Sequence, residues 1–450
     1  MVISDFETTF GSYSPYLLRL SVKRLFDDMK CGVRKPDFFP PKELPTLFHE
    51  FTHHLQNISS IAGISHLDCL IAIWHNARNV MRTPGDKKSR EQMEKAVANI
   101  KNYRPQGRQY LFVDPLKITE IDDFEVASTE RGPVKIKAMR GDASFELYFG
   151  IDAFFESCSY LLERSFRIAA GLEDASEITK SVPYKLGQFI GDFYAPGCSE
   201  MRLLLLSLTA MQHAAPHKAF LDLVKKVASS KISDDDLRSR LGKNVADLIK
   251  LNHTWLRNVE LQIQEGFPVK DPLLGDVIKE IFVLARDSLN DRIRNPFPEL
   301  DFLSRVREEF AAEDLTSFIN ASGGCMVFRD MGEVCDDDGN YVKEKDSCIV
   351  IGDERSIFRR RDAWNVFQTS IHYSLACEGG IVNSAQLNSK GSEGARCCPL
   401  FAYCDHVNRQ GTDSRCQSTP WRHEHIRYAE CQCSYQKAVY IADLKNRLEH

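Results

Sequence analysis

Two histidines four residues apart, with a glutamate directly after the first, form the part of this sequence best suited to chemistry. They lie in the run HEFTH, as His49, Glu50 and His53. On a helix, two residues separated by four positions project from the same side, one turn from each other, so both imidazoles can bind one metal ion. Glu50 projects about 100° further round the helix, where a carboxylate can take a proton from water on that metal and later return it. The motif predicts a zinc-dependent hydrolase with Glu50 as general base.

The residues around this motif predict a helix over residues 44–58. Pro45 falls in the first turn, where its missing N–H matters least, and apolar residues recur at helical intervals at Leu44, Leu47, Phe48, Phe51, Leu55 and Ile58. His49 and His53 lie beside this stripe, where we expect a buried but accessible cleft. The neighbouring His54 projects about 100° away, which predicts a solvated residue or a support for the site. The alternative for the pair itself is two core or surface histidines that bind no metal.

A catalytic zinc site usually has three protein ligands and one position for water, so a third ligand is needed. The residues after His53 read HLQNISSIAG and do not continue as the longer HExxHxxGxxH motif. The nearest further histidines, His66 and His75, lie on or near the next predicted helix, over residues 66–81. They are the first alternatives for this position.

A carboxylate from a later helix is the other common solution, and Glu156 offers one. It lies in a helix predicted over residues 152–170, among apolar residues where an unpaired charge is costly. In the alternative interpretation, the dipole of the helix stabilises a carboxylate that binds no metal. Glu163, two turns further on, is either another ligand, a residue that supports one, or an ion-pair partner of nearby arginines.

The run HEFTHHLQ followed by the helix FFESCSYLLE resembles the gluzincin class of zinc metallopeptidases. The resemblance extends over about residues 44–225 and includes the stretch LLLLSLTAMQHAAPHKAF. It implies that His49, His53 and Glu156 bind zinc and that Glu50 is the general base in the hydrolysis of a peptide bond. The two parts of the motif are about a hundred residues apart here, further than in compact members of the class.

A peptidase of this kind also needs a donor for the developing oxyanion, commonly Tyr, His or Arg. Tyr194 in GDFYAPG and His213 in MQHAAPH are candidates, because each lies near a predicted helix end. A core or capping role is the alternative for both.

Length and patterning predict an α+β protein that is mainly α-helical. A chain of 450 residues exceeds what one hydrophobic core usually serves. We expect a zincin-like metallopeptidase domain over residues 1–295, with a helical second half and an insertion over about 87–146. A cysteine-rich C-terminal α+β domain follows over 296–450, because ten of the fourteen cysteines lie there.

Further elements are predicted from periodicity and turn residues. A hairpin is expected within 325–351, with its turn at the acidic cluster 336–340. Short strands are expected at 110–113 and 134–137, and further helices at 185–193, 199–212, 218–229, 245–265 and 274–290.

The C-terminal cysteines offer a second metal site. Four of them can hold a structural zinc ion or an iron–sulfur cluster, namely Cys398, Cys404, Cys416 and Cys431. Their spacing is not that of paired CxxC motifs. The alternatives are thiols packed as small apolar side chains and a redox-sensing segment.

Composition and sequence pattern limit the classes of binding partner that we expect. The net charge of -5 gives no long-range attraction for nucleic acid. We found neither an apolar run long enough to span a bilayer nor a basic and then apolar start, and so expect a cytoplasmic protein with reduced thiols. The expected partner is a protein or peptide substrate, with an activating protein as a further requirement of some such enzymes. The alternative is a non-catalytic regulatory or protein-interaction module whose metal is structural.

Overall fold

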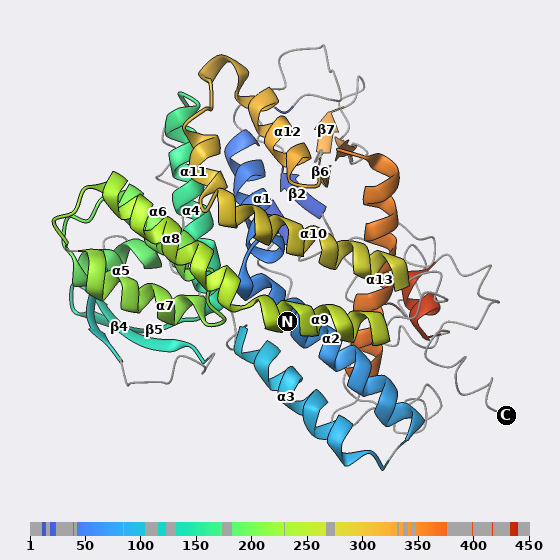
Figure 1. Ribbon diagram of the computed structural model, residues 1–450. Coiled ribbons are helices and arrows are strands. Elements are labelled where there is room, and N and C mark those ends of the chain that lie inside the picture. The colour runs from blue at the N-terminus through green and yellow to red at the C-terminus, as the bar shows by residue number, and fades with distance from the viewer. Residues whose placement is uncertain are drawn as a thin grey trace. The chain divides into compact units, whose positions relative to one another are not determined.

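The computed structural model is mainly helical, which confirms the predicted class of a mainly α-helical α+β chain (Figure 1). It describes residues 11–14, 19–23, 39, 43–83, 85–103, 116–122, 132–172, 182–228, 230–266, 275–330, 333–335, 341–343, 347–375, 398, 416 and 433–439.

The chain divides into two compact units that alternate along the sequence. Unit 1 comprises Met1–Ser65, Lys101–Leu256 and Val283–Ile357, and unit 2 comprises His66–Ile100, Arg257–Phe282 and Phe358–His450. Residues 296–357 therefore belong with the HEFTH segment, and the segment 87–146 is shared between the units. A single boundary near residue 296 does not describe this division.

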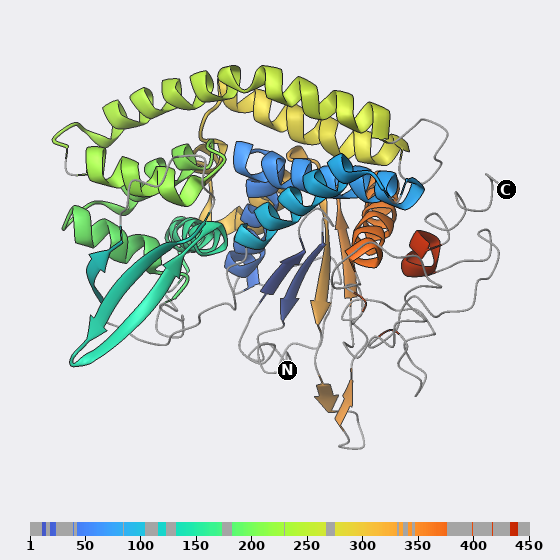
Figure 2. The same ribbon diagram turned by 90° about the horizontal axis from the view of Figure 1, so that it is seen from below.

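A mixed four-stranded sheet in unit 1 has the order β1-β2-β6-β9 (Figure 2). Its strands are β1 (Gly11–Ser14), β2 (Arg19–Lys23), β6 (Cys325–Asp330) and β9 (Ser347–Ile351). Only the β2–β6 pair is parallel. The sheet packs against α1, the helix that carries the HEFTH motif.

Antiparallel pairing of β6 with β9 confirms the predicted hairpin. Between them, β7 (Glu333–Cys335) pairs with β8 (Tyr341–Lys343), and Cys335 faces Tyr341. These partners flank the acidic cluster 336–340, which itself lies outside the described residues.

The second sheet of unit 1 is an antiparallel meander of β3 (Lys117–Ile121), β4 (Val134–Arg140) and β5 (Ala143–Phe149). The predicted strand at 134–137 is part of β4, whereas the one at 110–113 lies outside the described residues. Gly141, between β4 and β5, has φ of 55°, a conformation that glycine adopts without steric cost. Strand β5 leads through Gly150 directly into α4 (Ile151–Ala169).

Helix α1 spans Leu44–Ile58, as predicted. Its apolar side packs into an aromatic cluster, in which Phe48 lies 5.0 Å from Phe166 of α4 and 5.3 Å from Phe302, measured between ring centroids. Phe302 of α11 (Pro298–Leu303) stacks in turn on Phe318 of α12 (Ala311–Ala321). Burial of each such ring contributes about 1.5–3 kcal/mol, which holds α1 firmly against α4.

The end of α1 is tied down by a tight turn and a buried ion pair. A Cβ placed on Gly63, in the first turn of α2 (Ile61–Arg82), would meet the carbonyl oxygen of Asn57 at 2.3 Å, so this approach requires glycine. Ser59 Oγ donates to the Leu55 carbonyl and accepts a hydrogen bond from Arg292, which is paired with Glu299.

Some of the remaining helices follow the predictions, and others differ from them. Helix α2 begins at Ile61, five residues before the predicted start. The stretch predicted as one helix over 245–265 belongs to two, α8 (Asp234–Leu251) and α9 (His253–Gly266). Residues 224–228 form a π-helical turn after α7 (Pro216–Leu223). Helix α3 (Lys87–Tyr103), as well as α11 and α12, was not predicted. Helices α5 (Leu186–Tyr194), α6 (Glu200–Ala210) and α10 (Gly275–Arg294) lie close to their predicted ranges.

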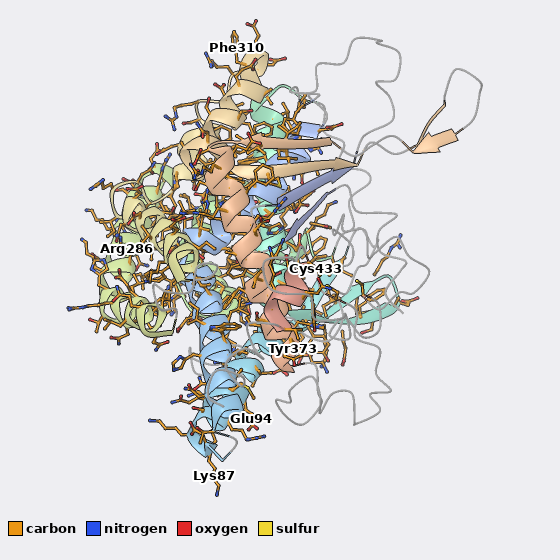
Figure 3. All side chains as sticks on the ribbon, turned by 90° about the vertical axis from the view of Figure 1, so that its right-hand side faces the viewer. Lys87, Glu94, Arg286, Phe310, Tyr373 and Cys433 are labelled. Atoms are coloured by element: carbon orange, nitrogen blue, oxygen red, sulfur yellow. The ribbon has the colours of Figure 1, made fainter. Side chains whose placement is uncertain are left out.

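In unit 2, aromatic rings join α2 to α13 (Glu354–Leu375). Phe367 lies 5.8 Å from Trp74 and 5.1 Å from Trp364, between ring centroids. His372, on α13, has its Nδ1 atom 2.9 Å from the hydroxyl of Tyr435, and Figure 3 labels Tyr373 and Cys433 in this region.

Among the described helices, none is by itself long and apolar enough to cross a membrane; α1 with the first part of α2 passes that test only as a bent pair, by length and composition.

Candidate metal centre

Two helices of unit 1, α1 and α4, bring the predicted ligands together. His49 and His53 lie one turn apart on α1, and Glu156 lies on α4. The Nε2 atoms of His49 and of His53 are each 3.3 Å from Oε2 of Glu156. One ligand atom from each residue lies within 4.8 Å of the other two. Residues about a hundred positions apart in the chain thus face one another.

The two nitrogen–oxygen separations of 3.3 Å fit a zinc ion. Zinc binds histidine nitrogen and carboxylate oxygen at about 2.0–2.2 Å in tetrahedral geometry, which sets neighbouring ligand atoms about 3.3–3.5 Å apart. Within the part of the chain that the structure describes, His49, His53 and Glu156 form the one group of three or more potential metal ligands. The alternatives His66 and His75 are not in it, and His75 is exposed.

The charged side chains of the group shift one another's pKa values. Burial disfavours the charged form of Glu156, but His53 and His49 beside it hold its pKa well below the ordinary value. Burial likewise opposes a charge on His49, but hydrogen bonds to Glu156 and Glu163 raise its pKa well above 6.5. The carboxylates thus provide the negative charge that a divalent cation requires.

Glu50 is buried beside the two histidines. Burial raises the pKa of Glu50 to about 7, because an ionised carboxylate is poorly solvated there, and the neighbouring histidines oppose this rise only in part. A carboxylate with a pKa close to neutral can both accept and release a proton.

Glu163 is a support for His49 and at the same time an ion-pair partner. Its Oε2 lies 3.0 Å from Nδ1 of His49, and its Oε1 accepts hydrogen bonds from Arg167 at 2.9 and 3.2 Å. A carboxylate on Nδ1 fixes the imidazole so that Nε2 faces the metal position. Two of the roles considered for Glu163 therefore occur together, and it lies outside the group of three.

Tyr184 is a neighbour of the site that sequence reasoning missed. Its ring lies edge-on to that of His49 at 5.8 Å and is tilted against that of Tyr160 at 6.2 Å, between centroids. Tyr184 lies between Pro183 and the start of α5. No sequence pattern relates this position to the HEFTH motif, so the sequence gives no signal for it.

Tyr194 and His213, the predicted oxyanion donors, have other neighbours. Tyr194 lies at the end of α5 against Phe193, with Lys225 Nζ 5.3 Å from its ring centroid. Burial lowers the pKa of His213, and the charge of Asp222 opposes this. Among the described contacts, neither makes a hydrogen bond or ring contact with His49, His53 or Glu156.

His54 is fully buried, at 0% exposure, with its ring 5.5 Å from that of Phe51. Of the two roles expected for His54, the solvated side chain was therefore wrong, and a support for the site stays a prediction. Every residue of α1 except Thr46 is buried, because the sheet and α4 both pack against this helix. A single amphipathic stripe in the sequence does not reveal such burial.

Of the four cysteines proposed for a second metal site, the structure describes Cys398 and Cys416. The backbone N–H of Cys398 donates to the carbonyl of Cys416 at 2.7 Å, which places these two residues side by side. Cys404 and Cys431 lie outside the described residues, so the second site stays a prediction.

Comparisons of the chain with family models, with curated proteins and with solved structures gave no match.

Proposed function

We propose that this chain is a zinc-dependent hydrolase, and specifically a metallopeptidase of the gluzincin type. His49, His53 and Glu156 would hold the metal, and Glu50 would be the general base. The observation that carries the proposal is that two imidazole nitrogens each lie 3.3 Å from the same carboxylate oxygen, with a buried glutamate next to the first histidine. Contact of α1 with both the four-stranded sheet and α4 supports a zincin-like core.

Zinc supplies a Lewis acid and lowers the pKa of a water molecule that it binds. Glu50 would accept a proton from the attacking water and pass it to the leaving amine nitrogen. Glu163 and Gln56 hold the two imidazoles by their Nδ1 atoms. Tyr184 joins Tyr194 and His213 as a candidate donor to the developing oxyanion, because its ring contacts His49.

The proposal includes a protein or peptide substrate, a cytoplasmic location and the second, cysteine-bound metal. Amide or ester hydrolysis of a smaller substrate would use the same groups. A non-catalytic module with a structural metal is the competing function. Structural zinc sites usually have four protein ligands, whereas the group formed by the described residues has three.

Zinc content of the purified protein tests the metal site. We expect His49→Ala to contain about one zinc ion per chain less than the wild type and Glu50→Gln. His75→Ala is the matched control, because His75 is an exposed histidine outside the group. An equal zinc content in His49→Ala and the wild type, or no zinc in the wild type at neutral pH with added zinc, would contradict the proposal.

Incubation with a diverse peptide library, read by mass spectrometry, tests the reaction. Cleavage by the wild type and its loss in zinc-loaded Glu50→Gln are expected. Equal cleavage by both proteins would show that Glu50 is not the base. Zinc binding through His49 without cleavage of any peptide or protein offered would favour the module with a structural metal.

A further inference from the structure

One buried amide joins the two helices that carry the metal ligands. Gln56 lies on α1 three residues after His53 and is 2% exposed. Its Oε1 lies 2.8 Å from Nδ1 of His53. Its Nε2 donates to the carbonyl oxygen of Phe155 at 3.1 Å and to Ser159 Oγ at 3.0 Å, both on α4.

The partners of Gln56 decide which way its amide points. A backbone carbonyl can only accept a hydrogen bond, so the NH2 group must face Phe155 and Oε1 must face His53. Nδ1 of His53 must then carry the proton, because Oε1 can only accept. Nε2 of His53 is left with its lone pair toward Glu156, where a metal ion would bind.

The same amide also positions the third ligand. Phe155 directly precedes Glu156, and Ser159 lies one helical turn after Phe155. Ser159 Oγ is 2.6 Å from Thr52 Oγ1, which is 2.7 Å from the carbonyl oxygen of His49. If Ser159 donates to Thr52 and Thr52 donates to His49, every hydroxyl hydrogen in this network has an acceptor. The network therefore connects the backbone of α1 at His49 with α4 around Glu156.

We propose that Gln56 is a positioning residue for the metal centre. It selects the tautomer of His53 that binds metal through Nε2, and it holds α4 in register so that Glu156 meets both histidines. This inference rests on the proposed function, because it requires metal at His49, His53 and Glu156. Gln56, on α1, would thus hold Nδ1 of His53 as Glu163 holds Nδ1 of His49.

The test is zinc affinity, measured by competition with a chromophoric chelator. Gln56→Met keeps the length of the side chain but removes all three hydrogen bonds, and we expect zinc to bind about 10–100-fold more weakly. Asn57→Leu is the matched control. Asn57 is the adjacent buried amide, and it donates to the backbone carbonyl of His53 at 2.7 Å instead of to its ring. We expect its zinc affinity to remain within about threefold of wild type, since the ring partners are kept.

Two further measurements separate positioning from general loosening of α1. With cobalt in place of zinc, the visible absorption bands should shift in Gln56→Met and remain unchanged in Asn57→Leu. Ser159→Ala removes one acceptor of the amide but keeps Phe155, so its zinc affinity should fall less than that of Gln56→Met. Ser159→Ala also provides the test if Gln56→Met does not fold.

The outcomes distinguish this inference from the proposed function. A wild-type protein that binds no zinc would overturn both. Normal zinc affinity and an unchanged cobalt spectrum in Gln56→Met, or in Ser159→Ala where only that variant folds, would overturn the role of Gln56 and leave the metal site intact. Equal weakening in Asn57→Leu and Gln56→Met would also overturn it, because the effect would then belong to the helix as a whole.

Discussion

Replacing Glu299 with Gln should destabilise unit 1, because it leaves a buried guanidinium without its counter-charge. Arg292 and Glu299 are 1% and 2% exposed and form a two-pronged pair. Arg292 also donates to Ser59 at 2.7 Å and to the carbonyl of Pro296 at 3.2 Å. Its Nε is buried and has no partner among the described residues. Breaking one side of such a pair costs about 3–5 kcal/mol.

That cost is a large part of the free energy of unfolding of a typical folded domain, which is about 5–15 kcal/mol. Urea unfolding followed by circular dichroism would measure it, with Arg292→Met/Glu299→Leu as the companion variant. Because the double variant buries no unpaired charge, we expect it to recover most of the lost free energy. A loss below about 1 kcal/mol in Glu299→Gln, the level of an exposed ion pair, would refute the reasoning. So would a double variant less stable than the single one.

Three further predictions concern the site and its surroundings. Glu163→Gln replaces the anion on Nδ1 of His49 by a neutral amide, and zinc should bind about tenfold more weakly in chelator competition; unchanged affinity would remove its supporting role. Tyr184→Phe should retain zinc but lower kcat on a cleaved peptide by about 10²–10³-fold if its hydroxyl stabilises the oxyanion, and an unchanged kcat would exclude that role. Burial lowers the pKa of His217 from 6.5 to about 4. Between pH 6.5 and pH 4, the imidazole of His217 is therefore protonated in the unfolded chain but neutral in the folded one. The free energy of unfolding should fall by up to about 3 kcal/mol as the pH falls from 6.5 to 4. His217→Phe should show a smaller fall in urea unfolding at the two pH values, and an equal fall in both proteins would contradict the assignment to His217.

The HEFTH helix could be predicted from sequence because its signals are local. Periodic apolar residues and Pro45 in the first turn set its range, and the structure has the same bounds, Leu44–Ile58. Glu156 could be proposed as a third ligand because a charge in an apolar helix needs a partner.

Helix α3 was missed because its buried face is narrow: Ser89, Met93 and Ala96 are buried along an otherwise polar sequence. Its apolar signal was too weak to mark a helix.

The sequence by itself determined which residues on one helix face the same way, and hence the pairing of His49 with His53. Only the tertiary structure decided what meets them: Glu156 and Glu163 from α4, the ring of Tyr184, and the orientation of Gln56. It also decided that His54 is buried and that the two units alternate along the chain. The physical reason is that helical spacing follows from bonds within one segment, whereas burial and hydrogen-bond partners depend on segments that the sequence separates by a hundred residues or more.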